Sequence, residues 1–228
     1  MIDRVTISPA PPTILGHSRP LLFLLIVVNA CWVLFIGVSS LLPESVTALD
    51  GLTRASVRIG VVLFPSLIYL GIREHGPWLD RLGLSSRHRR GILIGLAVSL
   101  IWLLPLLIYR WGSNQGTLNT HLTIGTWLNF ILGSPFAEEL LYRRIVYREL
   151  AHTVSRWKAI LLSSLWFTLL HLPPWIGTHS PLELIQHLGI IFVYGLLFAL
   201  LYQWSQSLWG SLIPHWLNNA VNSLYPAA

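Results

Sequence analysis

The amino-acid sequence predicts an all-α, polytopic membrane protein, a bundle of about seven transmembrane helices with six to eight as the expected range. Of its 228 residues, 54% are hydrophobic and only 11% are charged, whereas a soluble domain carries about 25% charged residues. The mean hydropathy is +0.63. The chain also holds 11 Trp and 7 Tyr, and these amphipathic rings gather at membrane–water boundaries.

The predicted elements follow from the spacing of the apolar stretches. Residues 1–19 are polar and rich in proline, which predicts a flexible N-terminal tail. Residues 20–42 contain no charge and are long enough to cross about 30 Å of hydrocarbon. A retained helix is favoured over a cleaved signal peptide, because this stretch is longer than a signal-peptide core and no small-residue cleavage site follows. Further helices are expected at 57–72, 91–109, 122–150, 158–172, 184–203 and 208–225.

No internal repeat is visible, so residues 20–228 are predicted to form a single membrane domain, with the candidate catalytic helices in 122–225. The fourth apolar stretch is interrupted by Gly133, Ser134 and Pro135. Serine is a good N-cap and proline suits the first helical turn. This pattern predicts either a kink or a fresh helix that begins at Pro135.

Charge distribution gives an orientation and excludes some partners. Basic residues gather between the second and third predicted helices and between the centre of the fourth and the start of the fifth, whereas loops 43–56 and 173–183 are poor in them. The positive-inside rule then places the N-terminus and both basic regions in the cytoplasm, with the chain in the plasma (inner) membrane. The net charge of +6 lies in such loops and forms no basic stripe with interleaved aromatics. Membrane lipids are therefore expected as partners, and nucleic acid is not. Cys31 is the single cysteine, so no disulfide can form within the chain.

Ionisable residues inside a membrane cost roughly 2.5–3.5 kcal/mol each and usually face the bundle interior. In the sequence AEELLYRR, Glu139 and Arg143 are four residues apart and can form an ion pair on one helix face. Glu138 lies about 100° round the helix, on the side of Tyr142 and without a cation nearby on its own helix. This isolation suits a general base. The alternative is that both glutamates anchor a loop at the cytoplasmic boundary.

Two further polar sites lie in the C-terminal half. His171 follows Phe167 by one turn, so the two rings can pack together. Glu138 lies roughly 21 Å from the expected cytoplasmic end of its helix, and His171 lies equally deep in the next helix at 1.5 Å per residue. His215 and Asn219 share a helix face, which suits stabilisation of an oxyanion. Taken singly, His171 could be an interfacial residue, and the His215–Asn219 pair could be a polar clasp between helices.

Together, the ordered motifs E-E-x-x-x-R, F-x-x-x-H and H-x-x-x-N between Gly133 and Asn219 resemble the CAAX-protease and bacteriocin-processing (CPBP, or Abi) family of intramembrane proteases. This family includes the type II CAAX prenyl endopeptidases. The resemblance implies that Glu138 is the general base that activates water, and that His171 holds the water or the reacting carbonyl. It further implies that His215 and Asn219 stabilise the oxyanion.

Supporting roles follow from the same resemblance. Glu139 and Arg143 would brace the base, and Tyr142 and Phe167 would pack around it. Arg144 stands where many members of the family have glycine, which places the local packing in question.

Cofactor use stays open between two chemistries. Glu138, His171 and His215 make up a His₂Glu set, a known zinc ligand composition. However, the chain has no H-E-x-x-H motif, and a glutamate that ligates a metal cannot also be the base. Metal-independent glutamate catalysis is therefore favoured, with no firm cofactor and a divalent metal such as zinc as the alternative.

The predicted function is an intramembrane endopeptidase that hydrolyses a peptide bond of a membrane-associated substrate. A prenylated C-terminus, a bacteriocin leader and a C-terminal sorting tail all suit such a site. One alternative is a non-catalytic membrane immunity or assembly protein of the same fold. Another is a transporter, which would need paired broken helices, and the sequence shows only one such break.

Overall fold

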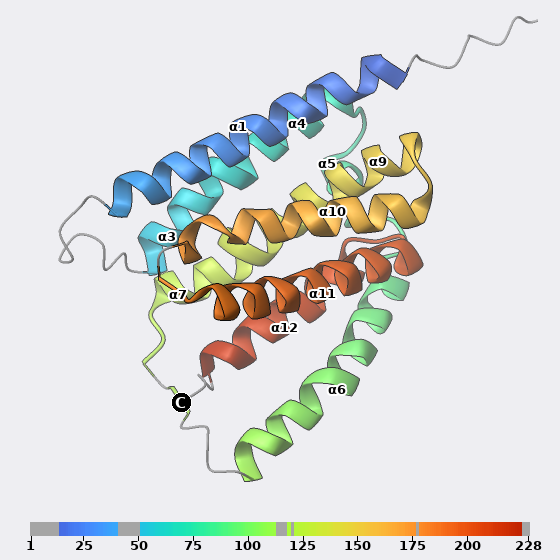
Figure 1. Ribbon diagram of the computed structural model, residues 1–228. Coiled ribbons are helices and arrows are strands. Elements are labelled where there is room, and N and C mark those ends of the chain that lie inside the picture. The colour runs from blue at the N-terminus through green and yellow to red at the C-terminus, as the bar shows by residue number, and fades with distance from the viewer. Residues whose placement is uncertain (1–13, 41–50, 113–117, 120, 177, 225–228) are drawn as a thin grey trace, which may run out of the picture.

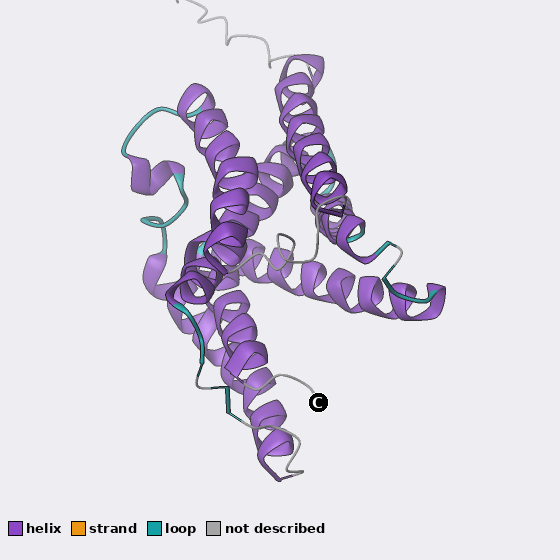
Figure 2. Ribbon diagram, turned by 90° about the vertical axis from the view of Figure 1, so that its left-hand side faces the viewer, coloured by secondary structure: helices purple, strands orange, loops and turns teal. Residues whose placement is uncertain are grey.

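The computed structural model describes residues 14–40, 51–112, 118–119, 121–176 and 178–224, and within them every regular element is a helix (Figure 2). The all-α prediction is therefore confirmed. Helix α1 (Ile14–Ser40) begins earlier than the expected residue 20. The rest of the expected tail, residues 1–13, lies outside the described residues.

The elements occupy the expected stretches in order. The N-terminal half contains α1, then a rod made of α3 (Gly51–Arg58), η1 (Ile59–Leu63) and α4 (Phe64–Arg73), then the short α5 (Trp78–Arg81) and the long α6 (His88–Gly112). The next rod is made of α7 (Ile124–Leu128), η2 (Asn129–Phe136), α8 (Ala137–Glu139), η3 (Leu140–Tyr147) and α9 (Arg148–Thr153). The chain ends with α10 (Arg156–His171), the short η4 (Pro173–Trp175), α11 (Pro181–Ser205) and α12 (Trp209–Leu224).

The rod made of α3, η1 and α4 begins at Gly51, so the loop expected over 43–56 is wrong for residues 51–56; residues 43–50 lie outside the described chain. The helix begins this early because of tertiary packing and not because of the apolar pattern of the sequence. Ala55 is buried, and a Cβ added at Gly133 would come within 3.0 Å of the Ala55 Cα. The small residues let α3 and η2 cross closely, which extends the helix beyond its apolar stretch.

The rod made of α7, η2, α8, η3 and α9 runs through Gly133–Pro135 without interruption, so the alternative of a fresh helix at Pro135 is wrong. Two of its segments, η2 and η3, are π-helical, and such wider turns often mark functional sites and kinks. Ser134 does not act as an N-cap, because its hydroxyl donates to the Glu138 carboxylate one turn later (2.6 Å).

The rods pack so that the polar C-terminal helices lie inside and the apolar ones lie outside. Helix α10 lies between α1 and α11, and α12 lies between α11 and α6 (Figure 1). All eight residues of η3 are buried, so it is the centre of the bundle.

Within the described residues, four outer helices are long and apolar enough to cross a membrane, over Arg19–Gly37, Ala55–Arg73, His88–Tyr109 and Pro181–Ser205. Large apolar side chains such as Phe23, Ile72 and Ile101 project outward from three of them with at least 70% of their surface exposed. Such a surface is suited to lipid, because a helix satisfies its own backbone hydrogen bonds. The chain is therefore a helical membrane protein.

Arg144, whose position raised a question about packing, is accommodated by partners at the end of α4 and in the following turn. Its Nη2 donates to the Glu74 carboxylate (2.5 Å) and to the Asp80 carbonyl (3.1 Å). Its aliphatic stem lies against Gly83, where an added Cβ would come within 3.0 Å of the Arg144 Cδ. Glu74 also accepts from Arg148 (2.5 Å). Arg144 thus links η3 to the end of α4 and to α5.

Gly195→Ala should destabilise the bundle by about 1–3 kcal/mol, the usual cost of overpacking. An added Cβ at Gly195 would lie 3.0–3.3 Å from the Cβ, Cα and backbone oxygen of Ser164, where α11 crosses α10. Gly189→Ala, on the same helix, is the matched control because its Cβ would meet nothing within 4 Å. Thermal unfolding in detergent should show a lower midpoint for Gly195→Ala and an equal or higher one for Gly189→Ala. Equal midpoints for the two variants would contradict the close crossing.

Candidate active site

The two adjacent glutamates of α8 are both buried, with 3% of Glu138 and none of Glu139 exposed. Because successive side chains on a helix point about 100° apart, the two carboxylates have different neighbours. The predicted pairing of Glu139 with Arg143 is confirmed, with 3.3 Å between Arg143 Nε and Glu139 Oε2. Glu139 also accepts a hydrogen bond from Nδ1 of His215 on α12 (2.9 Å).

Arg143 is completely buried, and its guanidinium faces two aromatic rings as well as Glu139. Its Cζ lies 4.9 Å from the ring centre of Phe167 and 6.0 Å from that of Phe198. These are cation–π distances. Through Glu139, the pair contacts His215, which in turn faces Glu138.

The two oxygens of the Glu138 carboxylate differ in their surroundings. Oε1 accepts from the Ser134 hydroxyl (2.6 Å) and lies 3.9 Å from Nη1 of Arg58. Oε2 lies 3.9 Å from Nε2 of His171 and 3.8 Å from Nε2 of His215, and it has no hydrogen-bond partner among the described residues. One oxygen is thus anchored, while the other is buried and free to accept.

Both imidazoles are oriented through their other nitrogen. Nδ1 of His171 donates to the Phe167 carbonyl (2.9 Å) and Nδ1 of His215 donates to Glu139; neither the carbonyl nor an ionised carboxylate can donate, so both Nδ1 atoms carry the proton. Such bonds fix the tautomer and aim Nε2 at the site. The rings are also packed, because Phe167 lies beside His171 (4.8 Å between centroids) and Phe198 stacks on His215 (4.7 Å).

The structure therefore brings Glu138, His171 and His215 together from three helices. The residue spacing predicted that Glu138 and His171 would lie at one level. Tyr142 and Phe167 meet edge to face (5.4 Å) beneath them. Asn219 lies one turn beyond His215 on α12 and is half-buried. It is not among the described contacts of the Glu138 carboxylate.

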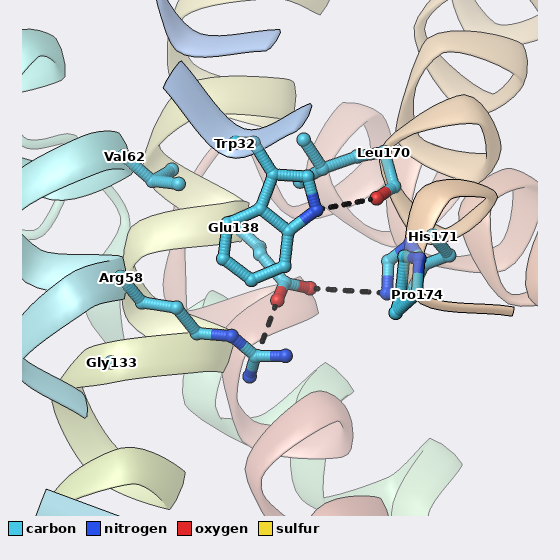
Figure 3. Close-up of a pocket in the computed structure, with 8 residues that line it drawn as sticks. All are labelled: Trp32, Arg58, Val62, Gly133, Glu138, Leu170, His171 and Pro174. Atoms are coloured by element: carbon cyan, nitrogen blue, oxygen red, sulfur yellow. Dashed lines mark hydrogen bonds and ion pairs between the residues drawn. The ribbon is translucent and has the colours of Figure 1, made fainter. Parts of the chain in front are cut away.

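A small cavity adjoins the free side of Glu138. It has a volume of about 30 Å³ and is lined by Trp32, Arg58, Val62, Gly133, Glu138, Leu170, His171 and Pro174 (Figure 3). Since one water needs roughly 10–15 Å³ of such space, the cavity has room for one or two water molecules. The Trp32 ring lies over the carboxylate, with Arg58 and His171 on either side (Figure 3).

Sequence reasoning missed three residues at this site. Ser134 was expected to cap a helix, although its spacing of four residues from Glu138 indicates a side-chain contact. Arg58 is the single charge between residues 55 and 72, and a charge within an apolar span is itself a signal of function. Trp32 gave no signal that distinguishes it from the other tryptophans.

The three metal candidates do not fit a zinc site as they stand. Neighbouring ligands on a tetrahedral zinc, with bonds of about 2.0–2.1 Å, lie roughly 3.3 Å apart. The two imidazole Nε2 atoms lie 3.9 and 3.8 Å from Glu138 Oε2. In the described part of the chain, no three His, Cys, Asp or Glu side chains are grouped closely enough to hold a metal ion.

Comparison with known proteins agrees with the residue motifs. Residues 119–221 match the family described as type II CAAX prenyl endopeptidase Rce1-like. This range covers both glutamates, both site histidines and Asn219, but not Trp32 or Arg58. Neither a search of curated proteins nor a search of solved structures found a match. Over residues 119–221, this helical membrane protein is therefore similar to the type II CAAX prenyl endopeptidases.

Proposed function

We propose that the protein is an intramembrane endopeptidase that hydrolyses a peptide bond with a water molecule activated by Glu138. The observation that carries this proposal is Oε2 of Glu138, a buried acceptor without a hydrogen-bond partner that faces Nε2 of His171 across 3.9 Å. One water molecule can bridge two polar atoms at such a distance. A water that donates one hydrogen to each acceptor would leave its lone pair free to attack a carbonyl.

The atoms of the reaction then have defined destinations. Glu138 Oε2 takes a proton from the water as its oxygen bonds to the scissile carbonyl carbon, and the carbonyl electron pair moves to the oxygen. The C–N bond then breaks, and Glu138 returns the proton to the leaving amine. His171 orients the water, and Asn219 donates to the oxyanion. For His215 to donate as well, its Nε2 must also carry a proton, and the Glu139 carboxylate, which accepts from Nδ1 (2.9 Å), then lies between this imidazolium and Arg143.

A substrate with a lipid-embedded or lipidated peptide tail suits this site, since the reacting groups lie inside a bundle whose outer helices face lipid. Among such tails, a prenylated C-terminal peptide is the first to test, because the matching family model describes prenyl endopeptidases. A bacteriocin leader and a sorting tail are the other two. We further propose that the chain lies in the plasma membrane with its N-terminus in the cytoplasm, on the distribution of basic loops.

The purified protein in detergent should cleave a prenylated peptide, and in H₂¹⁸O one ¹⁸O atom should enter the new carboxyl group, as mass spectrometry can show. Activity should survive a zinc chelator, because Glu138 serves as the base and not as a ligand. Loss of activity with the chelator and recovery with added zinc would instead support the metal-dependent alternative. A binding-only immunity or assembly protein would retain the intact peptide without any cleavage.

A further inference from the structure

Arg58 enters the site from the N-terminal half of the chain, outside the range that matches the family model. It is the last residue of α3, and its side chain is 27% exposed. Nη1 lies 3.9 Å from Glu138 Oε1, and the residue lines the same cavity as Glu138 and His171 (Figure 3). A cation thus lies beside the proposed base, on the opposite side from the two imidazoles.

The balance of charges at the site indicates a role for Arg58. The site holds two buried carboxylates, and Glu139 already has Arg143 as its counter-charge. Glu138 is 3% exposed, and an unpaired buried charge is costly. The two histidines that face it have their Nδ1 protons committed to other acceptors. Among the described residues, Arg58 is therefore the guanidinium that offsets the charge of Glu138.

Trp32 holds this guanidinium in place. The Arg58 Cζ lies 5.7 Å from the centre of the Trp32 ring, within cation–π range. The Trp32 Nε1 donates to the carbonyl of Leu170 (3.0 Å), the residue before His171. Helix α1 thereby fixes Arg58 relative to α10, which carries His171. An ion pair at the protein surface would not need these contacts of Trp32 with Arg58 and Leu170.

We propose that Arg58 is a catalytic residue that pairs with the Glu138 carboxylate before the reaction and with the oxyanion of the tetrahedral intermediate afterwards. This inference rests on the proposed function. When water gives its proton to Glu138 Oε2, the carboxylate becomes neutral and one negative charge moves to the carbonyl oxygen. The transfer itself leaves the net charge of the cavity unchanged, and the Arg58 cation offsets the negative charge at both positions. A guanidinium has five N–H donors, enough to contact both partners.

The kinetic test compares Arg58→Ala with Arg58→Lys and uses Arg73→Ala as the matched control, an arginine of the same rod that does not line this cavity. Arg58→Ala should lower kcat by about 10²–10³, as loss of an oxyanion donor does, with KM changed less than about threefold. Arg58→Lys should recover part of the loss, and added guanidinium ion at non-denaturing concentration should raise the rate of Arg58→Ala. A kcat for Arg58→Ala within threefold of wild type would overturn the proposal.

A second test does not depend on activity. Arg58→Ala should lower the unfolding midpoint by roughly 5 °C, because it leaves Glu138 as an unpaired buried charge. In a Glu138→Gln background the same substitution should lower it much less. Equal effects in both backgrounds would refute the ion pair. If the wild type cleaved no peptide, the proposed function and the catalytic role would both fail, whereas the stability comparison would still decide the pairing.

Discussion

Glu138→Gln should lower kcat by about 10²–10⁴, the range that a general base contributes, and should leave the protein folded. Glutamine keeps the shape of the side chain and can still accept from Ser134 through its amide oxygen, but it cannot take a proton from water. Its residual rate should not respond to guanidinium ion, which distinguishes it from Arg58→Ala. The measurement is cleavage of a prenylated peptide by detergent-purified protein, with an unfolding curve for each variant.

The natural control for this variant is Ser134→Ala, which removes the hydrogen bond to Glu138 Oε1 (2.6 Å) but leaves the base. We expect a loss of rate smaller than about tenfold, since a single neutral hydrogen bond contributes about 0.5–1.5 kcal/mol. Normal cleavage by Glu138→Gln would show that the assigned base is wrong. Equal losses for the two variants would indicate that position, not proton transfer, limits the rate.

The architecture could be read from the sequence because its determinants are local. Uncharged stretches of membrane-spanning length predict helices wherever they occur, and a spacing of four residues places Glu139 beside Arg143. The equal depth of Glu138 and His171 follows from the helical rise once the connection at residues 153–156 is recognised. Each of these predictions needs only a short segment of chain and a known helix geometry.

The parts that could not be predicted depend on contacts between distant segments. Nothing near Gly51 indicates that the helix begins there, because the packing of Ala55 against Gly133 decides it. In the same way, the partner of Glu138 Oε1 comes from α3, and the ring above it comes from α1. An arginine 80 residues before Glu138 is indistinguishable in sequence from a residue at the membrane boundary. A single sequence thus predicts the reacting groups more readily than it predicts their counter-charges.

Substitution of the neighbouring glutamate, Glu139→Gln, should have a different effect. It should lower the stability of the fold and not the activity alone. Arg143 is fully buried and has Glu139 as its ion-pair partner, and breaking a buried pair on one side costs about 3–5 kcal/mol. For a chain of this size that cost corresponds to a fall in the unfolding midpoint of roughly 10 °C.

The double variant Glu139→Gln with Arg143→Met should be more stable than the sum of the single effects predicts, because it leaves no unpaired charge in the bundle. Glu149→Gln is the matched control on the same rod, since Glu149 accepts from the neutral Tyr69 hydroxyl (3.2 Å) and should shift the midpoint little. Strictly additive effects of the two single substitutions would show that the pair is not coupled. In that case the effect of Glu139→Gln would come from the lost hydrogen bond with His215 and not from the lost pairing with Arg143.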